Sequence, residues 1–282
     1  MTLSETINQF LHHPNHLPKN LIWRFPQSKS NQKHIFIFGA PRSGTTLVKL
    51  ICGAHPHLNG TGYETGIFMY KDIFSFAFEG FTHNEMDLIR SNSTDIVDFF
   101  DKFSAENLKK NGGKRFIEKT PPHVLRIDFL LKYFPNSQFI NVFRDGRDCY
   151  CSARHHQNVM QGKNLQKYAK YWRRCVQARL KQGEKLNIFD VKYEELVTEP
   201  EKVVKKMMAF LQEDYDEKQL ISDYYSQNKI NKSNRKEFKK LSKPIDKASI
   251  NRYQLELSEQ EKKDFEKIAG KELNLLGYSS NI

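Results

Sequence analysis

Cysteine is scarce in this chain, and its placement excludes one large class of metal sites. The 282 residues contain four cysteines, Cys52, Cys149, Cys151 and Cys175. No two of them have the C-x-x-C spacing on which thiolate zinc sites are built, so such a site is excluded and no metal is expected. Unpaired cysteines are typical of a reducing compartment, which indicates a cytoplasmic protein.

Long apolar runs are also absent. Histidines interrupt the first 26 residues, and nowhere does the sequence contain the roughly 20 consecutive apolar residues that a transmembrane helix needs. We therefore expect neither a secretory signal nor a membrane span. Internal repeats and low-complexity linkers are missing too. This predicts a single domain over residues 33–282, with residues 1–32 as an N-terminal extension packed on it.

Acidic residues are outnumbered by basic ones. The chain has 45 lysines and arginines against 33 aspartates and glutamates, which gives a formal net charge of +12. Such an excess indicates an anionic partner, for example a nucleotide, a nucleic acid, an acidic peptide or a membrane surface. Part of the excess consists of lysines expected on solvated helix faces, as at residues 102–110 and 232–243.

What the sequence does contain is an alternation of strand and helix patterns. Apolar runs predict strands at residues 35–38, 115–118, 138–143 and 186–191. Helical periodicity predicts helices at residues 45–52, 93–110, 124–134, 146–158, 164–182, 200–211 and 258–269. Ser91 or Ser93 is expected to cap the helix at 93–110. The alternation indicates an α/β fold, in which helices cover both faces of a parallel sheet and ligands bind at the carboxyl ends of its strands.

The stretch "IFIFGAPRSGTTL" at residues 35–47 has the layout of a phosphate-binding P-loop. Gly39 and Gly44 have the P-loop separation, and the backbone N–H groups of such a loop form a cradle for an anion. However, Thr45 stands where an ATPase has the lysine that reaches its phosphates, and the loop's cation is Arg42. The loop is therefore predicted to hold a phosphate without the Mg²⁺-dependent chemistry of nucleotide hydrolysis.

A second anion site is predicted after the strand "QFINVF". Arg144 follows this strand directly, and Ser152 lies in the early turns of the next helix, so that the two can bind one phosphate together. Asp145, Arg147 and Asp148 lie between them and are expected to serve as caps and surface ion pairs. Two anion sites on neighbouring strands favour a nucleotide that is phosphorylated at both its 3′ and 5′ positions.

Together these stretches resemble the sulfotransferases that use 3′-phosphoadenosine 5′-phosphosulfate (PAPS). "PRSGTTL" is similar to their 5′-phosphosulfate loop, and Arg144 followed by Ser152 is similar to their 3′-phosphate pair. Further similar stretches follow in family order at residues 54–68, 118–148, 189–211 and 250–278. The resemblance covers about residues 34–278 and is greatest to tyrosylprotein sulfotransferases and a broad group of bacterial sulfotransferases. It implies the sulfotransferase fold, a P-loop-NTPase-like parallel sheet flanked by helices.

The resemblance also implies roles for individual residues. The 5′-phosphosulfate would be held by Arg42, Ser43, Gly44, Thr45, Thr46 and Leu47. Lys119, in "EKTPP", matches the catalytic lysine that acts with Arg42 on the leaving oxygen. Glu64, in "GYETGIF", matches the general base of tyrosylprotein sulfotransferases. His123 is the alternative base, because cytosolic sulfotransferases use a histidine just after that lysine.

Two further nucleotide contacts and one departure follow from the same resemblance. Tyr193 matches a tyrosine that contacts the nucleotide, and Arg252 matches a basic residue that helps to close over it. His156 stands where the family has an arginine, which leaves the third contact to the 3′-phosphate open. Arg154 is a nearby substitute.

The implied co-substrate is PAPS, the implied nucleotide product is 3′-phosphoadenosine 5′-phosphate (PAP), and no metal is needed. The acceptor is a hydroxyl, and a tyrosine in an acidic peptide is favoured over a carbohydrate, lipid or natural-product hydroxyl. Eukaryotic tyrosylprotein relatives carry a membrane anchor and lumenal disulfides, and neither is evident here. Several aromatic side chains between residues 60 and 100 would line an acceptor cleft, fill the core or contact a second copy in a homodimer. These are Phe68, Tyr70, Phe74, Phe76, Phe78 and Phe81.

Two other classes of protein are alternatives to a sulfotransferase. A P-loop kinase or NTPase is disfavoured because Thr45 replaces the lysine and no strand-end aspartate for Mg²⁺ is evident. A nucleic-acid-binding protein would need no Arg144–Ser152 pair and would show steeply salt-dependent affinity.

Overall fold

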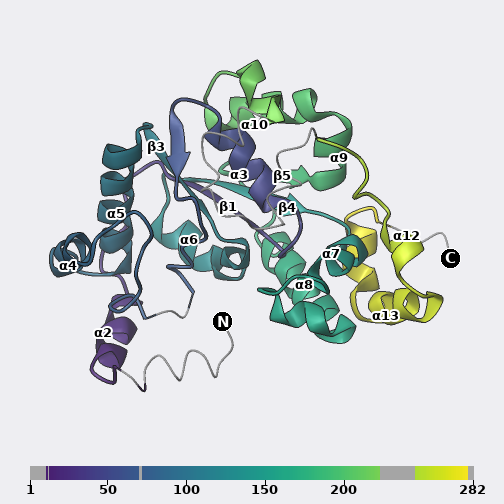
Figure 1. Cartoon of the computed structure of the whole chain (residues 1–282), viewed down its shortest axis with the longest axis horizontal. Coiled ribbons are helices and arrows are strands. Elements are labelled where there is room, and N and C mark those ends of the chain that lie inside the picture. Colours follow the sequence, from purple (N-terminus) through teal and green to yellow (C-terminus); the bar gives the residue numbers. More distant parts are fainter. Residues whose placement is uncertain (1–10, 12, 70–71, 223–244, 279–282) are drawn as a thin grey trace.

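A five-stranded parallel sheet lies at the centre of the molecule (Figure 1). The computed structural model describes residues 11, 13–69, 72–222 and 245–278. The strand order is β2-β3-β1-β4-β5, and every neighbouring pair is parallel. The strands are β1 (Ile35–Gly39), β2 (Leu58–Gly60), β3 (Arg115–Lys119), β4 (Gln138–Phe143) and β5 (Ile188–Lys192). This confirms the predicted α/β class and its P-loop-NTPase-like parallel sheet.

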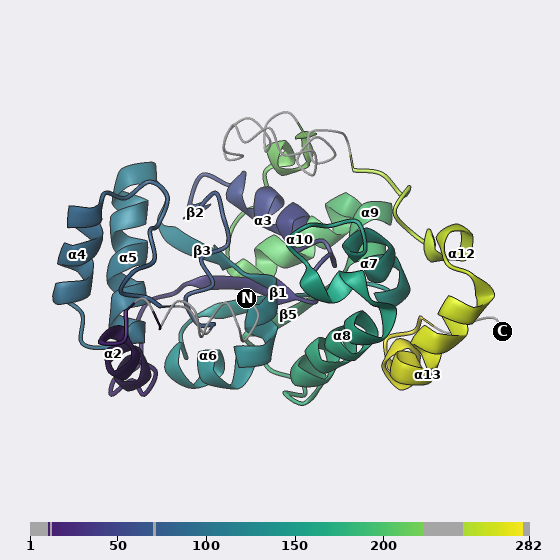
Figure 2. The same cartoon turned by 60° about the horizontal axis from the view of Figure 1, so that its bottom comes forward.

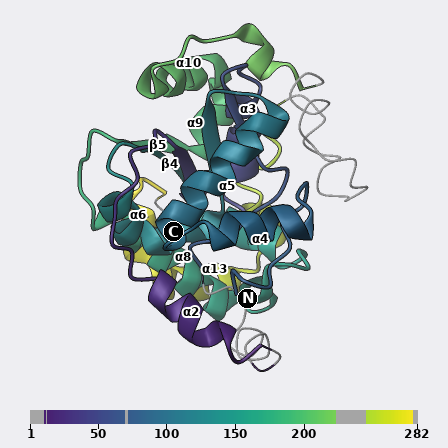
Figure 3. The ribbon, with the colours of Figure 1, turned by 90° about the vertical axis from the view of Figure 1, so that its left-hand side faces the viewer.

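Helices cover both faces of the sheet, and the alternation of side chains along β1 shows the reason. Ile35 and Ile37 pack on one face, whereas Phe36 and Phe38 pack on the other. The first face is covered by α3 (Thr45–Gly53), α9 (Tyr193–Thr198) and α10 (Pro200–Leu211). The second is covered by α5 (Ile96–Asn111), α6 (Ile127–Tyr133), α7 (Gly146–Ala153) and α8 (Leu165–Leu180). Figure 3 shows α3 and α10 together on one side of the sheet. A strand buried on both faces is a continuous apolar run, as this one is.

Two helical groups lie at opposite ends of the molecule. Figures 1 and 2 place α4 (His83–Ser91) and α5 at one end, and α12 (Tyr253–Glu256) and α13 (Glu259–Leu275) at the other. The remaining short elements are α2 (His16–Trp23), η1 (Pro121–Arg126), η2 (Met160–Lys163) and η3 (Glu217–Leu220).

The described part of the N-terminal segment packs on the rest of the chain. Trp23 of α2 belongs to the hydrophobic core, and the Asn20 amide donates to Asp72 at 2.7 Å. Farther along, the Ser30 hydroxyl donates to Asp101 at 2.8 Å. The division into an extension at 1–32 and a domain at 33–282 stays a prediction.

Several helix boundaries differ from the prediction. The expected cap at Ser91 or Ser93 is wrong: Ser91 ends α4, and the Asp95 carboxylate caps α5 by accepting from the backbone N–H of Val97 and Asp98. The helix expected at 124–134 begins earlier, as the 3₁₀ turn η1, because two prolines fit its first positions. The helix expected at 146–158 ends at Ala153. The three-residue edge strand β2 was not predicted, since it is too short to give a pattern.

The aromatic side chains between residues 60 and 100 form the core rather than an open cleft. Phe68 and Phe78 are buried in the main cluster, and Phe74, Phe76 and Phe81 pack against it. Tyr70 lies outside the described residues. Of the three roles that the sequence allowed for these side chains, the core is the one that the structure supports.

Replacing Asp95 by alanine tests the observed cap. Because Asp95 is buried and also accepts from the Gln27 backbone at 3.2 Å, Asp95→Ala should lower the free energy of unfolding by about 1–2 kcal/mol. Ser91→Ala is the matched control and should change it by less than about 0.5 kcal/mol. Urea unfolding of both variants measures the difference, and equal losses would contradict the assignment.

Candidate functional site

The predicted site residues come together at the carboxyl edge of the sheet. β1 runs into the glycine-bounded loop, β3 ends at Lys119, β4 is followed by Arg144, and β5 is followed by Tyr193. Because all of these strands are parallel, their carboxyl ends lie at one edge. The topology therefore brings together side chains that are far apart in the sequence.

The loop between β1 and α3 has the geometry of an anion cradle. Its backbone adopts positive φ at Arg42 (74°) and at Gly44 (106°). Gly44 must lack a side chain, since a Cβ atom there would lie 2.5 Å from the Tyr193 ring. No side chain caps the N-terminus of α3, and the buried Ser43 hydroxyl has no hydrogen-bond partner within the described chain. The first N–H groups of a helix are orphan donors, so this arrangement fits an anionic ligand.

Arg144 is the buried cation of the site. It is 5 % exposed, and its guanidinium lies over the Tyr193 ring at 4.4 Å from the centroid. It donates to the carbonyl oxygens of Arg42 at 3.0 Å and Ser249 at 2.6 Å. Its Nε atom is buried and has no partner among the residues described. A buried guanidinium with a donor to spare suits an anionic ligand.

Arg42 connects the two predicted anion sites. Its Nε donates to the Ser152 hydroxyl at 3.1 Å, while its carbonyl oxygen accepts from Arg144. The structure thus brings Ser152 and Arg144 to the same place through Arg42, without a direct bond between them among the described contacts. Both sites lie beside the paired strands β1 and β4, as the sequence predicted.

Lys119 and Glu64 form an ion pair at the start of α3. The Lys119 Nζ atom lies 2.6 Å from the Glu64 Oε1 atom and donates to the Thr46 hydroxyl at 3.2 Å. Lys119 is buried, whereas the Glu64 side chain is 48 % exposed. A fixed cation therefore lies next to a carboxylate that solvent and an acceptor can reach.

His123, the alternative base, lies in the interior. It is 1 % exposed, and its ring packs edge-on against Phe68 at 5.4 Å between centroids. Its Nδ1 atom is 3.7 Å from the Glu118 carboxylate. This position favours Glu64 over His123 as the group that meets an acceptor.

Glu118 is a buried residue beside the candidate site that the sequence analysis missed. It is completely buried directly before Lys119, and its carboxylate accepts from the Thr120 hydroxyl at 2.6 Å. The same hydroxyl accepts from the backbone N–H of Gly66 at 3.1 Å, which ties the loop carrying Glu64 to β3. Burial raises the pKa of Glu118 to about 7, partly offset by its hydrogen bonds. A charged residue inside an apolar strand pattern was the available signal.

The expectation of surface ion pairs for Asp145, Arg147 and Asp148 is wrong. All three are buried, although Asp145 does cap α7 as expected. Arg147 pairs with Asp145 at 2.7 Å and stacks on the Tyr253 ring at 4.0 Å. Asp148 accepts from the backbone N–H groups of Asn251 at 2.8 Å and Tyr253 at 2.9 Å. These contacts fix the segment around Arg252 against the end of β4.

Arg252 and Arg154 share one carboxylate. Glu256 accepts from the Arg252 Nε at 2.7 Å and lies 3.4 Å from an Arg154 nitrogen. His156 lies beyond the end of α7, where its Nδ1 accepts from the backbone of Asn158 at 3.2 Å. Arg154 rather than His156 is thereby placed next to Arg252, and the roles of all three stay predictions.

Comparison with known proteins identifies the family. The model of the sulfotransferase family matches residues 34–217, which is more than half of the chain. The chain belongs to the sulfotransferase family. This confirms the resemblance that the phosphate loop and the Arg144–Ser152 pair carried.

The curated relatives of this sulfotransferase-family chain are protein-tyrosine sulfotransferases. It is 30 % identical over 186 residues to protein-tyrosine sulfotransferase 1 of Danio rerio, and the aligned region covers 63 % of this chain and 52 % of that protein. It is 26 % identical over 262 residues to protein-tyrosine sulfotransferase A of Caenorhabditis elegans, which covers 88 % of this chain and 67 % of that protein. The chain spans about half the length of protein-tyrosine sulfotransferase 1 of Danio rerio and of protein-tyrosine sulfotransferase 2 of Gallus gallus.

Solved structures of sulfotransferases share the fold. The sulfotransferase domain of the Synechococcus olefin synthase superposes with a TM-score of 0.67 at 22 % identity, over 92 % of this chain and 99 % of that one. A mouse sulfotransferase complexed with PAP superposes with a TM-score of 0.58 at 16 % identity, over 92 % and 90 %. The predicted sulfotransferase fold is confirmed.

The cytoplasmic assignment is wrong. The curated relatives are protein-tyrosine sulfotransferases, which are Golgi membrane enzymes and not cytoplasmic ones. The assignment rested on the small number of cysteines and on the lack of a long apolar run, and neither feature decides the compartment. All four cysteines are free and buried in the structure. Among the described residues, no helix combines the length and the apolar character that crossing a membrane requires.

The buried carboxyl of Glu118 should make stability depend on pH. Its folded-state pKa of about 7 exceeds its ordinary value of 4.5, so between these values the folded protein binds more protons than the unfolded chain. Stability therefore falls as pH rises from about 4.5 to 7, and Glu118→Gln lacks this loss. Between pH 4.5 and 7 the free energy of unfolding of the variant, relative to that of wild type, should therefore rise by up to about 3 kcal/mol.

Urea unfolding of wild type and Glu118→Gln at a series of pH values measures this gain. Glu184→Gln changes an exposed carboxyl and serves as the control, whose curve should run parallel to wild type. A Glu118→Gln curve that also runs parallel to wild type would show that Glu118 titrates normally.

Proposed function

We propose that this chain transfers a sulfuryl group from PAPS to an acceptor hydroxyl. The observation that carries the proposal is the Lys119–Glu64 pair at 2.6 Å, at the start of α3 and on the same sheet edge as the buried Arg144. The Lys119 Nζ atom also donates to the Thr46 hydroxyl of α3 at 3.2 Å, and a cation and a carboxylate beside the helix N-terminus support this reaction. Membership of the sulfotransferase family supports the same reaction.

The nucleotide would lie along the carboxyl edge of the sheet. Ser43, Thr45, Thr46 and the N-terminus of α3 would hold its 5′ phosphosulfate, and Arg144 with Ser152 its 3′ phosphate. The buried Nε of Arg144 and the hydroxyl of Ser43, both without partners in the described chain, fit such oxygens. When bound, the nucleotide supplies the sulfuryl group and a phosphate leaving group. Tyr193, at the start of α9, and Arg252, just before α12, would close the site.

Burial and distance support the catalytic roles that we propose. Lys119 and Arg42 would stabilise negative charge on the leaving oxygen, and burial strengthens the effect of Lys119. Glu64 would take the proton of the acceptor hydroxyl. The ion pair with Lys119 uses the Oε1 atom of Glu64 and orients the carboxylate, so that Oε2 is left for the proton.

A tyrosine in an acidic peptide is the acceptor that the observations favour. The net charge of +12 suits an acidic peptide, and the curated relatives are protein-tyrosine sulfotransferases. A carbohydrate, lipid or small-molecule hydroxyl is the alternative within the same reaction. No observation on the described residues favours a P-loop kinase, because Thr45 stands at the position where such a kinase has its loop lysine.

Transfer of labelled sulfate from PAPS to an acidic tyrosine peptide tests the proposal, with the phenylalanine version of the peptide as blank. Glu64→Gln should lower kcat by about 10²–10⁴-fold, with little change in KM for PAPS, because only proton removal is lost. Glu79→Gln, an exposed loop carboxylate, is the matched control and should leave kcat unchanged.

Each contrary outcome removes a different part of the proposal. Loss of turnover in His123→Gln but not in Glu64→Gln would assign the base to His123. Transfer to a saccharide or lipid hydroxyl, but not to the peptide, would exclude the tyrosine acceptor. Absence of transfer to every class of hydroxyl would refute the sulfotransferase function.

A further inference from the structure

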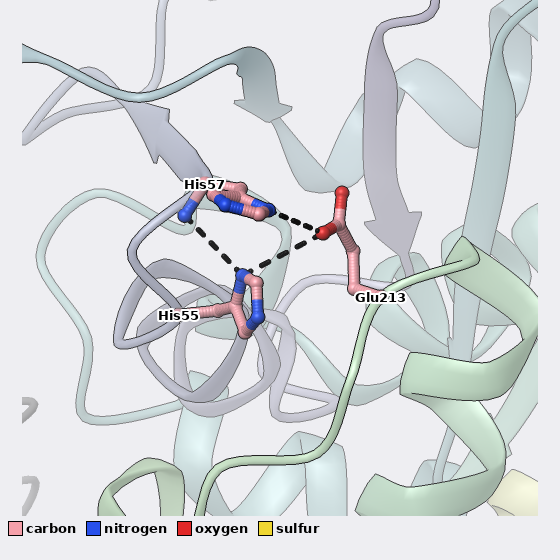
Figure 4. A group of neighbouring side chains, drawn as sticks. All are labelled: His55, His57 and Glu213. Atoms are coloured by element: carbon pink, nitrogen blue, oxygen red, sulfur yellow. Dashed lines mark hydrogen bonds and ion pairs between the residues drawn. The ribbon is translucent and has the colours of Figure 1, made fainter.

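Three metal-ligating side chains meet at the end of α3 opposite to the phosphate loop. His55 and His57 lie in the turn between α3 and β2, and Glu213 lies just after α10. Figure 4 shows the two imidazoles and the carboxylate facing a common point. Their ligand atoms all lie within 4.8 Å of one another. Glu213 is 156 residues from His57, so no spacing in the sequence could have indicated this cluster.

The distances within the cluster are close to those of a bound ion. Ligands of a tetrahedral Zn²⁺ site at about 2.1 Å from the metal are about 3.4 Å apart. The Glu213 Oε2 atom lies 2.8 Å from the His57 Nδ1 and 3.9 Å from the His55 Nδ1, one slightly below that value and one slightly above it. Shifts of about half an ångström would bring these two distances to that value, and the ligand atoms of the two histidines, which lie within 4.8 Å of each other, would have to approach to it as well. The His55 Nδ1 would give up its hydrogen bond from the backbone N–H of His57, which is long at 3.3 Å.

The surroundings favour a cation. A surface groove of about 590 Å³ is lined by His55, by the three carboxyl-bearing residues Asp214, Asp216 and Glu217, and by one lysine, Lys218, so that acidic side chains outnumber basic ones. The His57 side chain is 41 % exposed, which leaves room for water as a further ligand.

Neighbouring contacts hold the ligands in place. Arg115 lies 3.6 Å from the Oε1 atom of Glu213, so that Oε2 is the oxygen turned to the histidines. The His57 carbonyl accepts from the backbone N–H groups of Lys114 and Arg115, which fixes the turn against β3. The cluster is thereby ordered in the folded chain before any ion binds.

We propose that His55, His57 and Glu213 bind one divalent transition-metal ion, with Zn²⁺ the best match to two imidazoles and a carboxylate. The ion joins the α3–β2 turn to the segment after α10 and so stabilises the fold. It lies the length of α3 away from the phosphate loop, about 13 Å at 1.5 Å per residue, and takes no part in sulfuryl transfer. The scarcity of cysteine excludes only thiolate sites and leaves this one open.

Zinc titration of the full-length, untagged chain after EDTA treatment and dialysis tests the proposal. We expect one Zn²⁺ per chain, measured by competition with a chromophoric chelator, and a rise in Tm on binding, because the ion binds the folded state. His57→Ala and Glu213→Gln should each weaken this binding by more than about 100-fold. Tm and circular dichroism without metal show whether each variant is folded.

His13 is the matched control, because its ring stacks on His16 at 5.0 Å between centroids and offers a second histidine pair. His13→Ala should leave the tight site and the rise in Tm intact. Absence of stoichiometric binding in wild type, or equal binding in folded His57→Ala and Glu213→Gln, would overturn the proposal. So would loss of the tight site in His13→Ala. Sulfuryl transfer should be the same with and without Zn²⁺, so this result and the test of the transfer reaction are independent.

Discussion

The burial of the Arg144 guanidinium is the constraint on which the site depends. A buried cation is costly unless it is fully hydrogen-bonded or meets an anion. Arg144 meets two carbonyl oxygens, from Arg42 and Ser249, and the face of the Tyr193 ring. These partners come from the phosphate loop, the segment before α12 and the start of α9. One side chain therefore holds three separate parts of the chain around the end of β4, and its unbonded Nε leaves a place for a ligand.

The rest of the site is arranged around the same edge by buried carboxylates. Asp148 holds the backbone that precedes α12, and Glu118 with Thr120 holds the loop that carries Glu64. Both carboxylates are buried, and each fixes a segment that bears a candidate catalytic or binding residue. Glu118 and Thr120 fix the loop that carries Glu64 to β3, which carries Lys119. The geometry of the Lys119–Glu64 pair is therefore held by the sheet, although Glu64 itself lies in a loop.

Local signals in the sequence predicted the strands, the phosphate loop and most helices. β1 is a continuous apolar run because it is buried on both faces. "GAPRSGTT" predicts the loop because its backbone requires glycine at Gly44. Long-range partners were not visible. Asp148 was taken for a surface residue because the segment that buries it lies about 100 residues farther on. For the same reason Glu213 could not be joined to His57, and the edge strand β2 gave no pattern over three residues. The burial of His123 could not be predicted either, because it depends on how distant parts of the chain pack around it.

The central claim is that the carboxyl edge of the sheet binds a nucleotide with phosphates at both 3′ and 5′. Calorimetric titration with PAP, with adenosine 5′-phosphate and with ATP–Mg²⁺ measures this directly, on wild type, Ser152→Ala and Arg144→Gln. The account predicts that wild type binds PAP about 10- to 100-fold more tightly than adenosine 5′-phosphate, and that both variants lose most of this preference while remaining folded. Equal affinity of wild type for PAP and for adenosine 5′-phosphate would contradict the account, and so would a preference for ATP–Mg²⁺.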